Sequence, residues 1–250
     1  MFNLIITLII IFILITSYSV NESFSNTKSK VILITQFYKP KWKQRRNEIN
    51  DCLNNNLNNK YIDEIHLFVE GDQDFEKIFP NNKNLNKIHK ITLKDRLSFK
   101  DAFEYSNKNL SNSAIKILSN SDIYFNDTLK EIHNNLLDDK LVLALTRHNF
   151  NKKNKKIIKQ AAPSSSQDSW AWKGKMTLNP DDKYYKKDGI KLGYWGCDNY
   201  IANLFKKAGY SVSNPCQSII SIHLHEDFNK RAINRKNHTY YGEYHFIECV

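Results

Sequence analysis

Glycine, proline and paired cysteines are scarce in this sequence. Seven Gly and five Pro among 250 residues exclude a collagen-like or linker-dominated chain. The four cysteines form no C-x-x-C pair, which argues against a zinc ribbon or a thioredoxin-like site, and their pairing cannot be read from the sequence. The chain also has no Gly-rich loop of the G-x-x-x-x-G-K type, so nothing supports a P-loop kinase or sulfotransferase.

The chain has enough apolar residues for a buried core and carries a strong positive charge. Its 41% hydrophobic and 12% aromatic content excludes wholesale disorder. Lys and Arg number 37 against 26 Asp and Glu, a formal charge of +11 that favours nucleic acid, anionic membrane or phosphate-bearing substrates. The basic residues form no recognised nucleic-acid-binding motif, so we expect no nucleic-acid partner.

Residues 1–20 are an apolar run without a charged side chain, long enough to cross a bilayer as one helix. Ser17 and Ser19 have the spacing that a signal peptidase accepts, so the run is either a signal anchor or a cleaved signal peptide. We expect a short stem over residues 21–30 and one folded domain over residues 31–250. The domain would face the secretory lumen on a membrane anchor, or be secreted after cleavage. Asn-x-Ser/Thr sequons are weak evidence for a glycoprotein in so Asn-rich a chain; they begin at Asn21, Asn109, Asn126 and Asn237.

Hydrophobic patterns along residues 31–146 predict strands that alternate with helices. A continuous apolar run at 30–38 is typical of a strand covered on both faces, and apolar residues at three- and four-residue steps from Ile49 to Leu57 predict an amphipathic helix. Ser98 and Asp101 predict a capping box at the start of another helix. The other predicted strands span residues 61–71, 88–93, 115–118, 123–125 and 141–146. This is an α/β pattern, in which ligands bind at the carboxyl ends of the strands.

Two polar segments have residue types that bind divalent cations. Asn120-Ser121-Asp122 follows a predicted buried strand and would direct two oxygen ligands at a cation; the alternative is a polar turn. His223 and His225 lie on one face of a predicted strand, where an imidazole can complete a metal shell; the alternative is the polar face of an edge strand.

A helix predicted over residues 200–207 follows the segment GYWGCDN, which contains Asp198. Gly209 has the position of the glycine that ends such a helix. Asp198 is then either the N-cap of the helix or a general base that takes a proton from an attacking hydroxyl.

Aromatic and basic residues supply further candidates for substrate binding. We expect the segment QDSWAW to be a loop in which Asp168, Trp170 and Trp172 grip a sugar, although core tryptophans are equally consistent with it. Residues 149–160 are predicted to be a lysine-rich loop. Arginines after the first and third predicted strands could bind phosphate oxygens, with surface exposure as the default; they are Arg45, Arg46 and Arg96.

Taken in order, these features resemble the GT-A-type glycosyltransferases over roughly residues 31–235. The features are a membrane segment, Arg-Arg after a strand, NSDIYF, QDSWAW, GYWGCDN and a late HLH. The resemblance implies a single Rossmann-like GT-A domain with a mixed, mostly parallel central sheet flanked by helices. It also implies a hexosyltransferase-like enzyme that moves a sugar from a nucleotide-sugar donor to a hydroxyl of a glycan, protein or lipid acceptor.

The resemblance also assigns roles to individual residues. Asn120 and Asp122 stand where the family's D-x-D motif binds Mn²⁺ or Mg²⁺, and His223 or His225 matches its C-terminal metal-binding histidine. Asp198 matches the catalytic carboxylate, which would invert the anomeric centre. The family usually has Asp at the place of Asn120, so we expect weaker metal binding here. Donor binding is assigned to Arg45, Arg46, Arg96 and Ser121, and sugar or acceptor binding to Asp168, Trp170, Trp172, Trp195 and Asn199.

A non-catalytic role is the alternative. A membrane-tethered protein could hold anionic glycans or lipid headgroups with Trp170, Trp172 and the lysines of residues 152–159. Such binding would be sensitive to salt and would need no metal.

Overall fold

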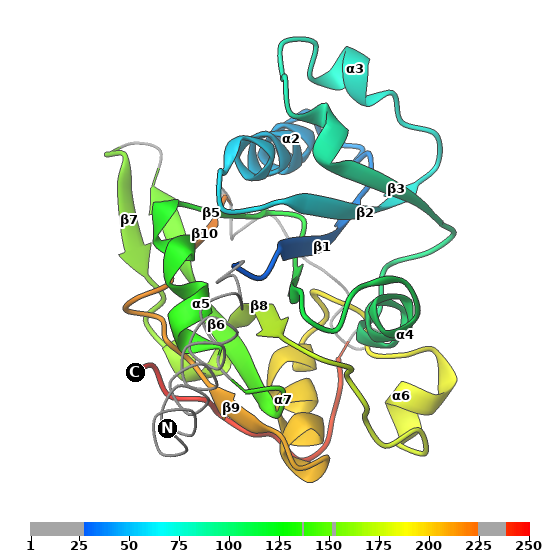
Figure 1. Ribbon diagram of the computed structural model, residues 1–250, viewed down its shortest axis with the longest axis vertical. Coiled ribbons are helices and arrows are strands. Elements are labelled where there is room, and N and C mark those ends of the chain that lie inside the picture. The colour runs from blue at the N-terminus through cyan, green and yellow to red at the C-terminus, as the bar shows by residue number, and fades with distance from the viewer. Residues whose placement is uncertain (1–27, 137, 152–153, 225–238) are drawn as a thin grey trace, which may run out of the picture.

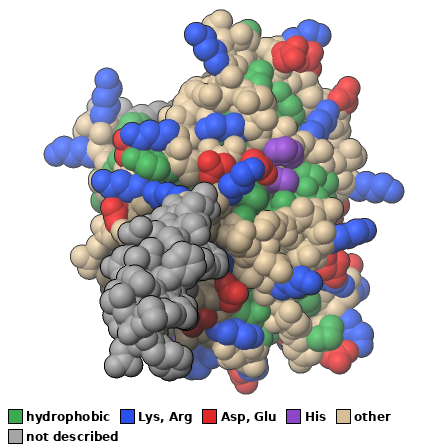
Figure 2. Space-filling model, viewed as in Figure 1, with side chains coloured by type: hydrophobic (Ala, Val, Ile, Leu, Met, Phe, Trp, Pro, Cys, Tyr) green, Lys and Arg blue, Asp and Glu red, His purple; other side chains and the backbone are tan. Residues whose placement is uncertain are grey.

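The computed structural model describes residues 28–136, 138–151, 154–224 and 239–250 (Figure 1). The apolar segment 1–20 and His225 lie outside these ranges. Within them, no helix combines the length and apolar character that a membrane span requires. On the face shown in Figure 2, Lys and Arg side chains are spread over the surface and form no single stripe.

A ten-stranded mixed sheet is the centre of the fold, with the strand order β3-β2-β1-β4-β8-β6-β10-β5 and with β7 and β9 also paired to β6. The parallel pairs are β1 with β2 and β4, β2 with β3, and β6 with β9 and β10. The strand bounds are β1 Val31–Phe37, β2 Glu64–Glu70, β3 Ile88–Leu93, β4 Ile115–Ser119, β5 Ile123–Phe125, β6 Leu141–Asn151, β7 Lys156–Lys159, β8 Gln167–Trp172, β9 Ser211–Ser213 and β10 Ser221–His223. The mixed, mostly parallel sheet predicted from the sequence is confirmed.

Helices cover both faces of the sheet (Figure 1). Alternate residues of a strand point to opposite faces, so Leu33 joins the core under α2 while Ile34 joins the core under α4 and α7. The helices are α2 Lys43–Asn58, α3 Phe75–Ile78, α4 Phe99–Asn109, α5 Ile132–Asn135, α6 Lys183–Lys187 and α7 Cys197–Lys207, with 3₁₀ turns η1 Leu85–Lys87, η2 Asp127–Glu131 and η3 Pro163–Ser165.

The strongest local sequence signals are confirmed. The strand predicted at residues 88–93 is β3 with the same bounds. At the start of α4, the Ser98 hydroxyl accepts from the Asp101 N–H at 3.1 Å, and the Asp101 carboxylate accepts from the Ser98 N–H at 3.1 Å. Gly209 follows the end of α7 in the left-handed region, with φ +80°, as a C-terminal glycine should.

Two segments predicted to be loops are strands. The segment QDSWAW is β8, an inner strand that pairs antiparallel with β4 and β6. Within residues 149–160, β6 continues to Asn151, and the β-branched Ile157 and Ile158 lie in β7, which pairs back onto it. The lysines of this segment suggested a loop, but β6 and β7 form an antiparallel pair.

The sheet has a switch point between β1 and β4. From β1 the chain continues outward through β2 and β3, and then returns to place β4 on the other side of β1. Loops at the carboxyl ends of β1 and β4 therefore diverge, and this edge of the sheet is where open α/β proteins bind ligands.

Candidate functional site

Polar side chains from four strands meet at the switch-point edge of the sheet. Asn120 and Asp122 follow the carboxyl end of β4, and His223 ends β10. Asp168 lies at the amino end of β8, which runs antiparallel to β4 and therefore starts at the same edge. Arg147 of β6 lies beside it.

Asp122 is the centre of the first group. Its Oδ2 lies 2.7 Å from Nη2 of Arg45 and 3.0 Å from Nε2 of His223. Nδ1 of His223 lies 3.2 Å from the amide oxygen of Asn149, which orients the ring. Burial acts to raise the pKa of Asp122, but Arg45 and His223 hold that pKa well below its usual range. Asp122 is therefore a buried, ionised carboxylate.

Asp168 is the centre of the second group. Its Oδ1 accepts from Nδ2 of Asn120 at 2.7 Å and its Oδ2 accepts from Nη1 of Arg147 at 3.0 Å. Asp198, in the first turn of α7, is close enough to be repelled by it. Burial and the Asp168 charge raise the pKa of Asp198 well above its usual value, while Arg147 opposes the rise.

Arg147 joins the two groups. Burial acts to lower the pKa of its guanidinium, and the carboxylates of Asp168, Asp198 and Asp122 together raise it above its usual value. The predicted residues Asn120, Asp122, His223 and Asp198 are thus brought to one place. Arg147 was not predicted as a site residue. The signal that could have identified it is its position directly after the strand predicted at residues 141–146.

Asp198 does not cap α7. The N-cap is Gly196, whose φ of +76° is a left-handed conformation that favours glycine, and Asp198 is the second residue of the helix. Its Oδ1 accepts a hydrogen bond from the Cys197 thiol at 3.1 Å. The N-cap interpretation is therefore wrong, and the charges of Asp168 and Arg147 act on the carboxylate.

The predicted sugar-gripping role of Trp170 and Trp172 is wrong. Their side chains are 2% and 0% exposed because β8 is an inner strand covered on both faces. Trp172 packs edge-on against Phe103 at 5.1 Å between ring centroids. The alternative function, glycan binding by these two indoles, is not supported because neither ring is accessible to a ligand.

Asn199 and Trp195 were both predicted to bind the sugar or the acceptor, and the structure treats them differently. The Asn199 side-chain amide donates to the carbonyl oxygens of Ser164 at 3.0 Å and His245 at 3.3 Å, so it ties the C-terminal segment to α7 and is not free to bind a sugar. The predicted role of Asn199 in sugar binding is therefore wrong. Trp195 is 51% exposed and lies three residues before Asp198, so acceptor binding by Trp195 stays a prediction.

The residues predicted to bind the donor already have protein partners. Arg45 bonds Asp122 and also lies 3.1 Å from Glu48. Arg46 donates to the Pro40 carbonyl at 3.3 Å. Arg96 donates to the Leu192 carbonyl at 3.1 Å and lies 5.1 Å from the ring centre of Tyr194. Ser121 is partly exposed in the turn after β4. Phosphate binding by these four residues stays a prediction.

The residues at Asp122 fit a divalent cation in ligand type. The Asp122 carboxylate and Nε2 of His223 are an oxygen and a nitrogen donor of the kind that Mn²⁺ accepts, whereas the Asn120 amide bonds Asp168. Arg45 neutralises the same carboxylate, so it would compete with a cation for Asp122.

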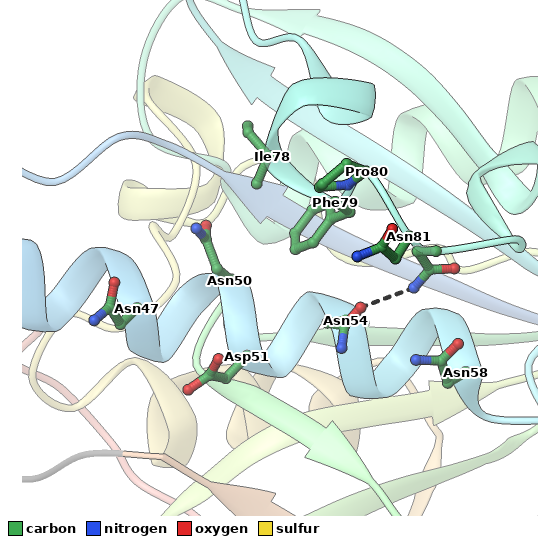
Figure 3. Close-up of a pocket in the computed structure, with 10 residues that line it drawn as sticks. Asn47, Asn50, Asp51, Asn54, Asn58, Ile78, Phe79, Pro80 and Asn81 are labelled. Atoms are coloured by element: carbon green, nitrogen blue, oxygen red, sulfur yellow. Dashed lines mark hydrogen bonds between the residues drawn. The ribbon is translucent and has the colours of Figure 1, made fainter.

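A hollow of about 450 Å³ lies elsewhere, between α2 and residues 78–82 (Figure 3). Asparagines provide much of its lining, and Asn54 accepts a hydrogen bond from Asn82 at 2.8 Å across it. It contains none of the candidate site residues, and among its lining residues only Asp51 is titratable.

Comparisons with known proteins support the fold. No family model matches the chain, and no curated protein matches its sequence. A mannosyltransferase from Pyrobaculum calidifontis, solved with GDP-Man and Mn²⁺, superposes with a TM-score of 0.51 at 14% identity, over 83% of this chain and 59% of that one. GalNAc-T7 with UDP, GalNAc and Mn²⁺ gives 0.49 at 10% identity, over 81% of this chain and 45% of that one. TarS from S. aureus with UDP-GlcNAc gives a TM-score of 0.47 at 15% identity, over 79% of this chain and 59% of that one.

The chain therefore has a GT-A-like α/β fold and is structurally similar to nucleotide-sugar glycosyltransferases. It spans about three fifths of the length of the mannosyltransferase. A likeness at 14% identity shows the fold alone, so the chemistry has to be argued from this chain's own residues.

Proposed function

We propose that this chain is a glycosyltransferase that moves a sugar from a nucleotide-sugar donor to an acceptor hydroxyl. The observation that carries the proposal is the meeting of Asp122, Asp168, Asp198, His223 and Arg147 at the switch point of a GT-A-like sheet. Segments up to about a hundred residues apart supply these groups, as with Asp122 and His223. A purely structural role would not require three carboxylates at one edge of the sheet, because each buried charge costs free energy.

The proposed roles follow from charge. Asp122 and His223 would hold a divalent cation, which supplies positive charge to the leaving diphosphate. Arg147, with Arg45 or Arg96, would add to the positive potential on the donor side. Asp198 would accept the proton of the acceptor hydroxyl as its oxygen attacks the anomeric carbon from the face opposite the leaving diphosphate. The bond to the diphosphate breaks as the new bond forms, so the displacement would invert the anomeric centre. Burial and the Asp168 charge raise the pKa of the Asp198 carboxyl, which makes it a stronger base than an exposed carboxylate.

The test is the substitution Asp198→Asn in the full chain. Wild-type protein incubated with a panel of nucleotide sugars and Mn²⁺ should release nucleoside diphosphate in the presence of an acceptor. Asp198→Asn should reduce kcat by about 10²–10⁴-fold and leave the circular dichroism spectrum unchanged.

Asp188→Asn is the matched control, because it makes the same chemical change at an exposed carboxylate of the preceding segment. It should retain wild-type turnover. An Asp198→Asn enzyme as fast as wild type would remove the catalytic assignment, and no turnover of any donor by the wild type would count against the transferase itself.

We also propose that residues 1–20 deliver this domain to the secretory pathway, as an anchor or as a cleaved signal. The Cys216–Cys249 disulfide supports an oxidising compartment. Alkaline extraction of membranes distinguishes the two forms: an anchored chain stays with the membrane and a cleaved one is released. A reduced chain found in the cytosol would contradict both.

A further inference from the structure

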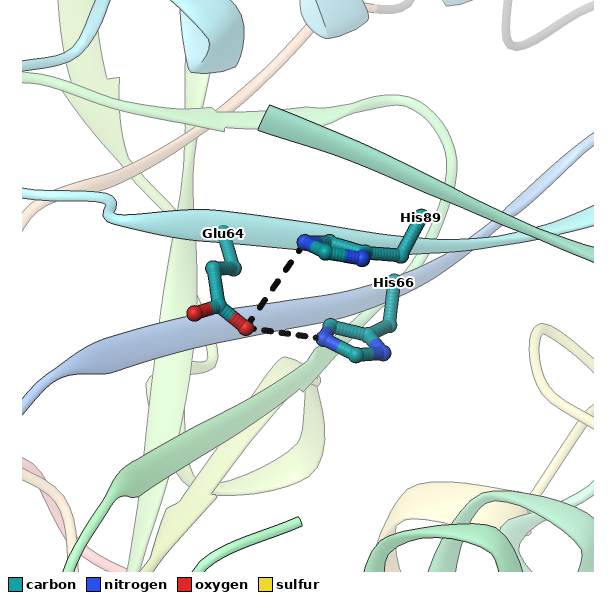
Figure 4. A group of neighbouring side chains, drawn as sticks. All are labelled: Glu64, His66 and His89. Atoms are coloured by element: carbon teal, nitrogen blue, oxygen red, sulfur yellow. Dashed lines mark hydrogen bonds and ion pairs between the residues drawn. The ribbon is translucent and has the colours of Figure 1, made fainter. Parts of the chain in front are cut away.

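Glu64, His66 and His89 form a cluster away from the candidate active site (Figure 4). Glu64 begins β2 and therefore lies near the amino ends of the parallel strands, whereas Asn120 and Asp122 follow a carboxyl end. The cluster is independent of the proposed transferase chemistry.

Strand geometry brings the three side chains together. Glu64 and His66 are two residues apart in β2, so both point to the same face of the sheet. His89 of β3 is the direct register partner of His66, and the two imidazole rings stack with 4.6 Å between centroids and 13° between planes. As Figure 4 shows, each ring turns one nitrogen toward the Glu64 carboxylate.

The distances fit a small tetrahedral metal ion. Oε2 of Glu64 lies 3.2 Å from Nε2 of His66 and 3.8 Å from Nε2 of His89, and the three ligand atoms all lie within 4.8 Å of one another. Zinc–ligand bonds of about 2.0–2.2 Å place tetrahedral ligands about 3.3–3.5 Å apart. The atom separations thus suit one ion, and the His89 ring, which is half exposed and stacked on His66, would have to turn out of the stack to direct its nitrogen at that ion.

The surrounding residues orient the cluster as metal sites require. The Tyr105 hydroxyl lies 2.8 Å from Nδ1 of His66, which leaves Nε2 as the nitrogen directed at the carboxylate. Such a partner on the second ring nitrogen is typical of metal-binding histidines. Lys30 bonds the other carboxylate oxygen, Oε1, at 2.7 Å, so Oε2 is the oxygen that faces the rings. The side chain of His89 is 48% exposed, which gives an ion and a water access from solvent.

We propose that Glu64, His66 and His89 bind one Zn²⁺ ion that links the edge strand β3 to β2. Two imidazoles and one carboxylate with an open position suit Zn²⁺ better than Ca²⁺ or Mg²⁺, which prefer oxygen ligands throughout. The ion stabilises the folded state because the unfolded chain has no preformed site.

Isothermal titration of the metal-free full chain, in detergent, with zinc chloride tests the proposal. Wild type should bind one Zn²⁺ more than His89→Ala, or bind it at least about tenfold more tightly. Zinc should raise the unfolding temperature of wild type, and a chelator should reverse the rise. Glu64→Gln is the second variant and should also weaken binding while keeping the hydrogen-bonding shape of the side chain.

His133→Ala is the matched control, since it removes a histidine of α5 that belongs to neither cluster, and it should bind zinc as wild type does. His223→Ala separates this site from the one at Asp122: it should keep the zinc equivalent that His89→Ala loses. Zinc binding that is equal in wild type, His89→Ala and Glu64→Gln would overturn the proposal, as would the absence of any binding to wild type.

Discussion

Arg147 is the residue on which both halves of the candidate site depend. It bonds Asp168 at 3.0 Å, and the two side chains are 20% and 8% exposed. We expect Arg147→Ala to lower the free energy of unfolding by about 3 kcal/mol, because it leaves a buried carboxylate without its charge partner. Urea denaturation would measure the loss. The double variant Arg147→Ala/Asp168→Asn should lose less than the sum of the two single losses. Additive losses would show that the pair is not coupled.

Asp122 should make stability depend on acid pH. Its native pKa lies well below the usual value, with burial opposed by Arg45 and His223, so its ionised form stabilises the fold above the unfolded-state pKa of about 4. That contribution is lost as pH falls from about 4 toward the native pKa. Asp122→Asn should therefore be less stable than wild type at pH 7, and the difference should shrink as the pH is lowered through this window.

Urea midpoints at pH 7, 4 and 2.5 would follow this difference, because the loss is confined to pH values below about 4. Asp127→Asn, which changes an aspartate of the nearby 3₁₀ turn η2 that has no part in the site, is the control and should show no such trend. A constant gap between Asp122→Asn and wild type across the range would mean that the carboxylate is not held ionised by its neighbours.

At the scale of secondary structure elements, local signals in the sequence predict local structure well. An uninterrupted apolar run predicted β1, and the Ser98–Asp101 box predicted the start of α4, because each depends only on neighbouring residues. The segment QDSWAW begins with three polar residues, and its mixture of polar and aromatic residues suggested a loop. Only its pairing between β4 and β6 makes it an inner strand, and that pairing involves residues far apart in the chain.

The same limit applies to the site. Asn120 and Asp122 were predicted from their place after a strand and His223 from the His-x-His pattern. Asp122 and His223 do meet, and Asn120 bonds Asp168 beside them. Arg147 and the ion pair of Arg45 with Asp122 depend on which strands are neighbours and on how α2 packs, which periodicity does not specify. Trp170 and Trp172 were misassigned for the same reason, since burial is decided by the sheet order.

Strand β8 should therefore respond to mutation as core. We expect Trp172→Ala to lower the free energy of unfolding by about 3–5 kcal/mol, because its buried indole fills the space beside Phe103. Trp195→Ala, at a half-exposed indole, should change stability by less than about 0.5 kcal/mol and should instead raise the KM for the acceptor. Urea denaturation measures the stability of both variants, and titration with acceptor measures the KM of Trp195→Ala. A Trp172→Ala chain as stable as wild type would contradict the placement of β8.

At the scale of the whole molecule, the C-terminal segment completes the region around Asp198. The Tyr240 N–H donates to the Trp195 carbonyl at 2.8 Å, and the His245 N–H donates to the Asn199 carbonyl at 3.0 Å, so this segment runs along the start of α7. Gly196 lies beneath it, and a Cβ there would meet the Tyr240 carbonyl at 2.7 Å. The position of the proposed base thus depends on a segment more than forty residues away in sequence.

The Cys216–Cys249 disulfide anchors that segment and should supply much of the molecule's stability. The bond closes a loop of 33 residues, for which chain entropy predicts a stabilisation of about 3.5 kcal/mol. Cys216→Ser/Cys249→Ser should lose about that amount in urea denaturation. It should also lose the proposed transferase turnover, because the C-terminal segment along the start of α7 is no longer anchored. Dithiothreitol should produce the same loss in wild type and none in the double variant, because the other two cysteines, Cys52 and Cys197, are free. Equal stability of wild type with and without dithiothreitol would mean that the C-terminal segment is held by its hydrogen bonds alone.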